Sequence, residues 1–225
     1  MKNILIALFL LTLITAPAAT VAKEKKEIPE YTVEGLKLVP GTKDIATIWA
    51  KPGVDLSTYK RFYIVEPYVA FRKNWQQDQN RGHPSLRVKV SDMEDIKRDL
   101  KELFMEVFTE ELLGAGYAFS EVRAEDVLII KPAILDLDVN APDIQSSSQT
   151  DILTASAGSM TLYMELYDSV TEDLLVKAVD PSSDRDASVM HWQTSVANRA
   201  AAKRMMKPWA EALRRGFDIS RDSTQ

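Results

Sequence analysis

The two histidines are the residues best suited to acid–base catalysis near neutral pH, because only histidine normally titrates there. His191 follows two aspartates and Ser188 closely, so a Ser-His-Asp arrangement can be drawn around it. No Gly-x-Ser-x-Gly turn accompanies it. We therefore interpret His191 as a polar residue early in a helix, and we expect His83, in a polar stretch, to be solvated.

Carboxylates are the other groups that could do chemistry. Asp136, Asp138 and Asp143 could supply oxygen ligands to Ca²⁺ or Mg²⁺. However, acids that alternate with leucines are also what a half-exposed strand requires, and the spacing of a calcium-binding EF-hand is absent. Among 33 acidic residues, no glycosidase pair stands out. The sequence also lacks a glycine-rich phosphate loop, and we predict no metal and no cofactor.

Aromatic residues are dense between positions 59 and 75. Tyrosine, tryptophan and arginine are enriched at the centres of protein interfaces. A possible partner surface therefore comprises Tyr59, Tyr63, Tyr68, Arg72 and Trp75. The alternative interpretation is the core of a sheet with one exposed aromatic row, which is the more common arrangement.

Composition limits the classes of function. The chain contains no cysteine, which excludes disulfides, thiolate metal sites and the acylated cysteine of bacterial lipoproteins. The net charge is −5, and loss of the first 22 residues would leave 27 basic against 33 acidic residues. A net negative chain does not favour nucleic-acid binding, which depends on clustered cations.

The N-terminus has the layout of a secretory signal peptide. Lys2 precedes an apolar run from Ile4 to Ile14, which is followed by small residues up to Ala22 and then by charge. Cleavage after Ala22 would leave 203 residues, enough for one sizeable core. We thus predict a signal peptide over 1–22, a periplasmic location and no stable membrane anchor after cleavage.

The remaining chain predicts one domain of mixed structure. We expect a leader arm over 23–44, a single α+β domain over 45–220 and a disordered tail over 221–225. Apolar periodicity predicts strands over 45–49, 62–71, 127–139, 160–166 and 174–179. We expect polar loops over 72–86, 140–158 and 180–186.

Two helices complete the pattern. Ser91 and Glu94 suggest the capped start of a helix over 91–113 with one apolar face. A second helical region follows Ser188, with Pro208 as a kink or a new start and Gly216 as its end. The order β-α-β-β-β-α predicts a two-layer α+β sandwich, with both helices on one face of a mixed, mostly antiparallel sheet.

Several motifs resemble one bacterial envelope family, domain of unknown function 3313. The matching residues are Tyr31 with 36–40, the run Pro52-Gly53-Val54-Asp55-Leu56-Ser57-x-Tyr59, the strand 62–71, Gly158-Ser159-Met160, the run Glu165-Leu166-Tyr167-Asp168-Ser169-x-Thr171, and Trp209 in the closing helix. The resemblance covers about residues 31–220 and implies no activity and no catalytic residues. Many members look like lipoproteins, whereas this chain lacks the cysteine.

Three hypotheses for function follow. The first is an exported, non-catalytic envelope protein that binds a protein or another envelope component. The second is a periplasmic hydrolase that uses the loops 72–90 and 140–158. The third is a carrier of an apolar ligand held in a groove between sheet and helices.

Overall fold

The computed structural model describes residues 27–40, 43–82, 87–140, 153–154, 158–183, 191–192 and 195–222. The helices are α1 (Trp75–Gly82), α2 (Val90–Gly114) and α3 (Ser195–Asp222). The strands are β1 (Lys37–Leu38), β2 (Thr47–Ala50), β3 (Arg61–Ile64), β4 (Tyr68–Phe71), β5 (Ala118–Phe119), β6 (Val127–Val139), β7 (Leu153–Thr154), β8 (Gly158–Asp168), β9 (Leu174–Ser183) and β10 (His191–Trp192).

The main sheet is mixed and open. Its strand order is β1-β2-β9-β8-β6-β3-β5, and β4 also pairs with β6. The pairs β3–β5, β3–β6 and β4–β6 are parallel, whereas the pairs on the other side of β6 are antiparallel. The parallel pairs follow from the crossover through α2, which returns the chain to the sheet in the same direction.

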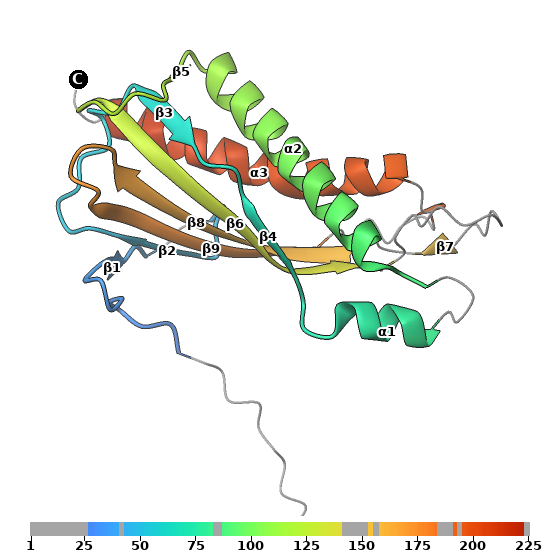
Figure 1. The fold of residues 1–225 in the computed structure, drawn as a ribbon. Helices are drawn as coiled ribbons and strands as arrows, with labels where there is room; N and C mark the ends of the chain where they lie inside the picture. Colours follow the sequence, from blue (N-terminus) through green and yellow to red (C-terminus); the bar gives the residue numbers. More distant parts are fainter. Residues whose placement is uncertain are drawn as a thin grey trace, which may run out of the picture.

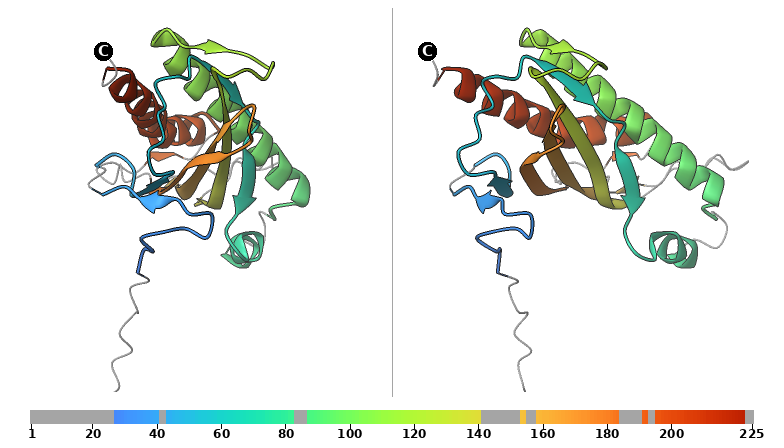
Figure 2. Two further views of the ribbon diagram at one scale, coloured as in Figure 1. Left: turned by 90° about the vertical axis from the view of Figure 1, so that its left-hand side faces the viewer. Right: turned by 60° about the vertical axis from the view of Figure 1, so that its left-hand side comes forward.

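Helices α2 and α3 lie side by side on one face of this sheet (Figures 1 and 2). The core between the two layers includes Phe62, Phe104, Leu128, Met206 and Trp209, all nearly inaccessible to solvent. This arrangement confirms the predicted two-layer α+β fold with the order β-α-β-β-β-α among its long elements.

The strand predicted over 62–71 is split into β3 and β4, which follow β6 one after the other. Ile64 is opposite Ile130 and Tyr68 is opposite Ala133, so the β3–β4 segment contains one extra residue at the break. Pro67 lies in this break. Because proline has no backbone N–H to donate to a neighbouring strand, it is placed where the pairing is interrupted. The carbonyl of Ile130 accepts from the N–H of Val65, so the backbone of Ile130 faces the β3–β4 segment. Every second residue of a strand faces the same neighbour, so the backbone of Pro132 faces this segment as well, at the break.

A bulge in β6 overturns the predicted alternation of that strand. The alternation of Asp136 and Asp138 with leucines predicts one buried face that contains Ala133, Leu135, Leu137 and Val139. Instead, Leu128, Ile130 and Ile134 are buried before the bulge and Leu137 after it. Asp136 has φ +50°, and the register shifts here against both β4 and β8. The extra residue exchanges the two faces of the strand.

Residues 75–82 form a helix, so the predicted loop over 72–86 is wrong at its centre. The polar composition of α1 hid the fact that its side chains hold it to the sheet. Trp75 Nε1 and Gln79 Nε2 both donate to the carbonyl of Val139, at 3.1 and 3.0 Å. Asn74 takes φ +62° in the turn before the helix, a conformation that asparagine tolerates better than most residues.

The second predicted helix starts later and ends later than the sequence suggested. His191 and Trp192 form β10, which pairs with β7, and α3 begins at Ser195. Pro208 lies within α3 on its exposed side and starts no second helix, since buried neighbours hold the helix on the sheet. Gly216 does not end α3, because the next residue, Phe217, is buried against Phe62 with ring centroids 4.6 Å apart.

Three local predictions also need correction. The N-terminus of α2 is capped by Asp92, whose carboxylate accepts from the N–H of Lys89 at 2.7 Å, rather than by Ser91 and Glu94. Strand β9 continues to Ser183, through the stretch predicted as a loop, because it remains paired with β8. The predicted loop 140–158 contains the short strand β7, and most of it lies outside the described residues.

Candidate partner-binding surface

The sheet has a second face, opposite α2 and α3, and its side chains are arranged in rows across the strands. Along β8, the residues at even positions from Met160 to Leu166 are buried beneath the helices, and those at odd positions point to the other side. We call this second side the outer face. The leader arm and α1 lie toward its two ends (Figure 1).

Two rows of the outer face carry tyrosines. Tyr63, Ile129 and Tyr167 are opposite one another on β3, β6 and β8. A second row contains Tyr68, Ala133 and Tyr163, and continues to Val179 on β9. Tyr63 and Tyr68 are 41% and 65% exposed, which is unusual for such large side chains. We call these two lines the tyrosine rows.

A charged row lies between the tyrosine rows. It contains Lys131 on β6, Glu165 on β8 and Lys177 on β9, which are opposite one another in the register. Both tyrosine rows are tied to it, because the hydroxyls of Tyr163 and Tyr167 donate to the two oxygens of Glu165 at 2.5 and 2.7 Å. Glu165 therefore links one tyrosine of each row, Tyr163 and Tyr167, through hydrogen bonds.

The cations of the charged row also contact the tyrosine rings. Lys131 and Lys177 each place the ammonium group 5.9 Å from a ring centroid, that of Tyr167 and that of Tyr163 respectively. Burial, and then the hydrogen bond to Glu165, raises the pKa of Tyr167 above its ordinary value. The same causes raise the pKa of Tyr163, so Tyr163 and Tyr167 stay neutral hydrogen-bond donors to Glu165 at physiological pH.

The leader arm covers one end of the charged row. Lys177 donates to Glu34 at 2.7 Å, and the hydrogen bond from Lys177 lowers the pKa of Glu34 to about 2. Trp49 Nε1 donates to the carbonyl of Pro29 at 2.9 Å, and Leu36 is buried. Within the predicted arm, Leu36 is buried against the body, whereas Tyr31 is 51% exposed.

The five residues predicted as a partner surface do not lie together. Tyr63 and Tyr68 are exposed on the outer face, in separate rows. Tyr59 and Trp75 are buried: the hydroxyl of Tyr59 donates to Asp168 at 2.8 Å, and the indole ring of Trp75 stacks on Phe71. Arg72 is held between Asp78 and Asp138, at 2.6 and 2.8 Å.

Sequence reasoning missed Tyr163 and Tyr167 as surface residues. The signal was present in the alternation of the strand 160–166, whose buried even positions leave Tyr163 and Glu165 on the other face. What the sequence lacks is the register that sets these residues opposite Tyr63 and Tyr68.

The hydrolase and metal hypotheses receive no structural support from the residues described. The loop 72–90 contributes Asp78, which is paired with Arg72 and Arg81. Asp138 pairs with Arg72, and within the described ranges no group of three or more histidines and acids could hold a metal ion. His83, Asp143 and the side chain of His191 lie outside what the structure describes.

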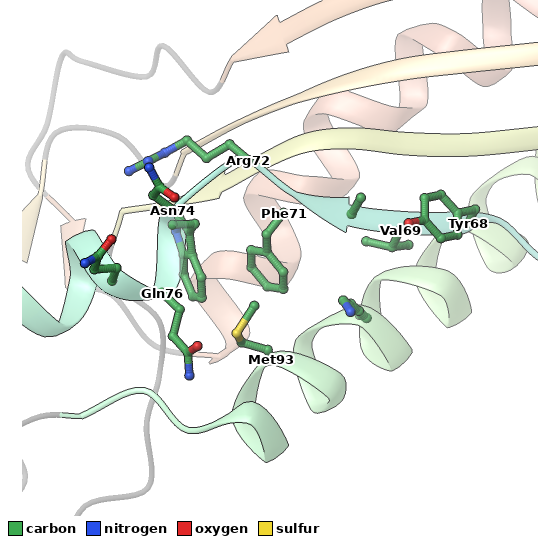
Figure 3. Close-up of a pocket in the computed structure, with 11 residues that line it drawn as sticks. Tyr68, Val69, Phe71, Arg72, Asn74, Gln76 and Met93 are labelled. Atoms are coloured by element: carbon green, nitrogen blue, oxygen red, sulfur yellow. The ribbon is translucent and has the colours of Figure 1, made fainter.

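An open pocket of about 380 Å³ lies at the free edge of β4, near the N-termini of α1 and α2. Phe71 and Met93 point toward each other across the space between β4 and α2, and Arg72 points away from Met93 (Figure 3). Among the described residues that line it, the charged ones are Arg72, which is paired with Asp78 and Asp138, and Lys97, which is paired with Glu94. The pocket therefore lies at an edge of the sheet. The carrier hypothesis predicts a groove between the sheet and the helices, but in the described structure large side chains fill that space.

These features define a two-layer α+β protein whose open sheet presents tyrosines on the face opposite its helices. The chain belongs to the family of proteins of unknown function designated DUF3313, whose family model matches residues 33–213. The resemblance drawn from the sequence motifs is therefore confirmed. A search of curated proteins finds no match.

Comparison with solved structures finds weak similarity to distant proteins. Protein XCC0632 from Xanthomonas campestris is 14% identical, with a TM-score of 0.40 over 78% of this chain and 94% of that protein. The PelC dodecamer from Paraburkholderia phytofirmans gives 8% identity and a TM-score of 0.36, over 75% of this chain and 96% of that one. These values are too low to indicate a shared function. In the described part of this chain, no helix is long and apolar enough to cross a bilayer.

Proposed function

We propose that the protein is an exported, non-catalytic component of the cell envelope that binds another envelope protein through the tyrosine rows. The observation that carries this proposal is the outer face itself. Four tyrosines flank a charged row on the side of the sheet that α2 and α3 leave uncovered. Tyrosine contributes large contact area and a hydrogen bond at low cost in conformational entropy, which suits a binding surface.

Export to the periplasm is part of the proposal. The signal-peptide pattern over 1–22 supports it, as does the absence of cysteine from a chain destined for an oxidising compartment. Intact-mass analysis of protein recovered from the periplasm tests it. A chain beginning at Lys23 is expected, and a chain that still carries Met1 would contradict it.

Photocrosslinking in cells tests partner binding. A photoreactive phenylalanine analogue at Tyr63 or at Tyr68 is expected to yield one discrete crosslinked product. The matched control is Leu113, which is 53% exposed on α2, in the helix layer. Crosslinking that is equal at Leu113 and at the tyrosines, or absent from both tyrosines, would reject the tyrosine rows as the binding surface.

A further inference from the structure

The outer face carries an exposed cation that forms no ion pair with any described residue of its own chain. The ammonium of Lys131 lies 5.9 Å from the ring centroid of Tyr167. Glu165 is directly opposite Lys131 on the neighbouring strand, yet the two charges do not pair in the described structure. At the other end of the charged row, Lys177 is held by Glu34 at 2.7 Å. Lys131 is therefore a charge that a partner can engage.

Glu165 can accept a further donor. Its two oxygens accept from the hydroxyls of Tyr163 and Tyr167, and Lys177 lies 3.8 Å from one of them. A carboxylate offers about four acceptor positions, so the two hydroxyls leave part of this capacity unused. The centre of the outer face thus presents a cation and a carboxylate side by side that are not paired with each other.

The neighbours of this pair differ in size in the same sense. Ala133 is opposite Tyr163, and Ile129 is opposite Tyr167, with all four side chains on the outer face. A line midway between β6 and β8 therefore separates a strand with smaller apolar residues and a cation from a strand with tyrosines and a carboxylate. The two sides of this line complement each other in size and in charge.

Two-fold symmetry makes use of such a line. In a contact between identical surfaces, each residue of one copy meets its complement on the other copy, and the reverse contact forms as well. A half-turn about the line between β6 and β8 places β6 of a second copy over β8 of the first. Lys131 of each copy then meets Glu165 of the other. In the second tyrosine row, the same half-turn sets Tyr68 against Val179 of the other copy.

Sheet packing sets the strength of this contact. Packed sheets lie about 10 Å apart and cross at about 30°, so the pairs close to the axis, on β6 and β8, stay opposite each other. The four strands β4, β6, β8 and β9 span about 19 Å, and the rows extend over about 20 Å along them. This is a small interface, so we expect a dissociation constant in the micromolar range.

We infer that two copies of the chain associate through their outer faces as a two-fold dimer, in which Lys131 of each copy pairs with Glu165 of the other. This inference rests on the proposed function, because it names a second copy as the partner of the tyrosine rows. The core of each copy lies on the helix side of the sheet, so a separated copy keeps its fold.

Analytical ultracentrifugation of the mature full-length protein tests the association. The average mass should rise from one chain toward two as the protein concentration increases through the micromolar range. A mass of one chain at every concentration up to about 0.5 mM would overturn the inference.

An exchange of charges tests the pairing. Lys131→Glu and Glu165→Lys should each weaken the dimer at least tenfold, because like charges then meet twice across the contact. An equimolar mixture of the two variants should form a heterodimer, since both pairs again join opposite charges. Lys207→Glu, a reversal of an exposed lysine on α3, is the control and should change the affinity less than twofold. No heterodimer from two folded variants, or an equal loss in the control, would overturn the inference.

Photocrosslinking of the purified protein locates the contact without a charge reversal. A photoreactive phenylalanine analogue at Tyr68 should yield a covalent dimer, with the link near Val179. Within one chain these positions are three strands apart, about 14 Å, so a link between them joins two copies. A dimer linked elsewhere, or no dimer, would overturn the inference even if a charge variant fails to fold.

The same analogue in cells separates this inference from the proposed function. A product of twice the mass of the chain supports both. A product that contains a different envelope protein in place of the second copy overturns the inference and leaves the proposed function standing. The absence of any product from Tyr63 and from Tyr68 rejects both.

Discussion

The two faces of the sheet differ in what they do with aromatic residues. On the helix side, Phe104 and Phe108 stack with ring centroids 3.9 Å apart and are inaccessible to solvent. On the outer face, Tyr163 and Tyr167 share a carboxylate and remain half-exposed. Phe104 and Phe108 belong to α2, but strand β8 contributes to both faces, because its even residues from Met160 to Leu166 are buried beneath the helices while Tyr163 and Tyr167 face outward, so alternate residues of this strand serve stability and surface chemistry separately. Substitutions on each face should therefore have separable effects.

The largest effect is expected from a core aromatic. Phe104→Ala should lower the free energy of unfolding by about 4 kcal/mol, because it creates a cavity between α2 and the sheet. Tyr63→Ala, on the outer face, should cost less than about 1 kcal/mol. Urea unfolding of the two variants checks the difference, and equal losses would show that the outer face is also part of the stabilising core.

Gly158 provides the next largest effect. It has φ +144°, and a Cβ there would lie 1.9 Å from the carbonyl oxygen of Asp138. Gly158→Ala should lower the free energy of unfolding by about 3 kcal/mol through strain and displacement of β6. Gly53→Ala is the control, since φ is also positive there but no atom lies within 4 Å of the added carbon. If thermal unfolding shows the same loss for both variants, backbone strain alone accounts for it.

The charged row should contribute less than the core. Lys177→Met removes the partner of Glu34 and Glu165 and is expected to cost about 1 kcal/mol. Lys131→Met, a matched change at the exposed end of the same row, should be nearly neutral. Urea unfolding measures the free energy of unfolding of both variants. A larger loss for Lys131→Met than for Lys177→Met would show that the exposed end of the row contributes more to stability.

The smallest effect is a pH dependence of the leader arm. The pKa of Glu34 falls from 4.5 to about 2 in the folded protein, so its contribution to arm docking is complete above pH 4.5 and is lost as the pH falls toward 2. The indole resonance of Trp49, which donates to Pro29, should shift over this window. Glu34→Gln should remove this pH-dependent shift of the Trp49 resonance. If the resonance of the variant still shifts over the same pH range, a group other than Glu34 causes the shift.

The sequence was most informative where packing is periodic. The bounds of strand 127–139 and the apolar stripe of helix 91–113 were correctly predicted, because both elements are long, although the bulge at Asp136 breaks the alternation within the strand. The family resemblance was also correct. Fold class followed from the order of these elements rather than from any single motif.

Errors arose where one contact outweighs local pattern. The polar composition of residues 75–82 predicts a loop, yet Trp75 anchors a helix through a carbonyl 64 residues away. Likewise, Phe217 holds α3 beyond Gly216. Of the residues proposed as a partner surface, Tyr63 and Tyr68 are exposed, and their alignment with Tyr167 and Tyr163 depends on strand register, which no local pattern specifies.

The extra residue at Asp136 has a consequence for comparisons within the family. Because it reverses the orientation of the residues that follow, Leu137 turns inward and Asp138 reaches Arg72. A homologue that lacks this extra residue would have a regular strand here, in which the residue equivalent to Asp138 still lies opposite Ser159 and keeps its orientation. Alignments of relatives should therefore allow a one-residue gap at Asp136, because an ungapped alignment would match inward-facing residues with outward-facing ones beyond this point.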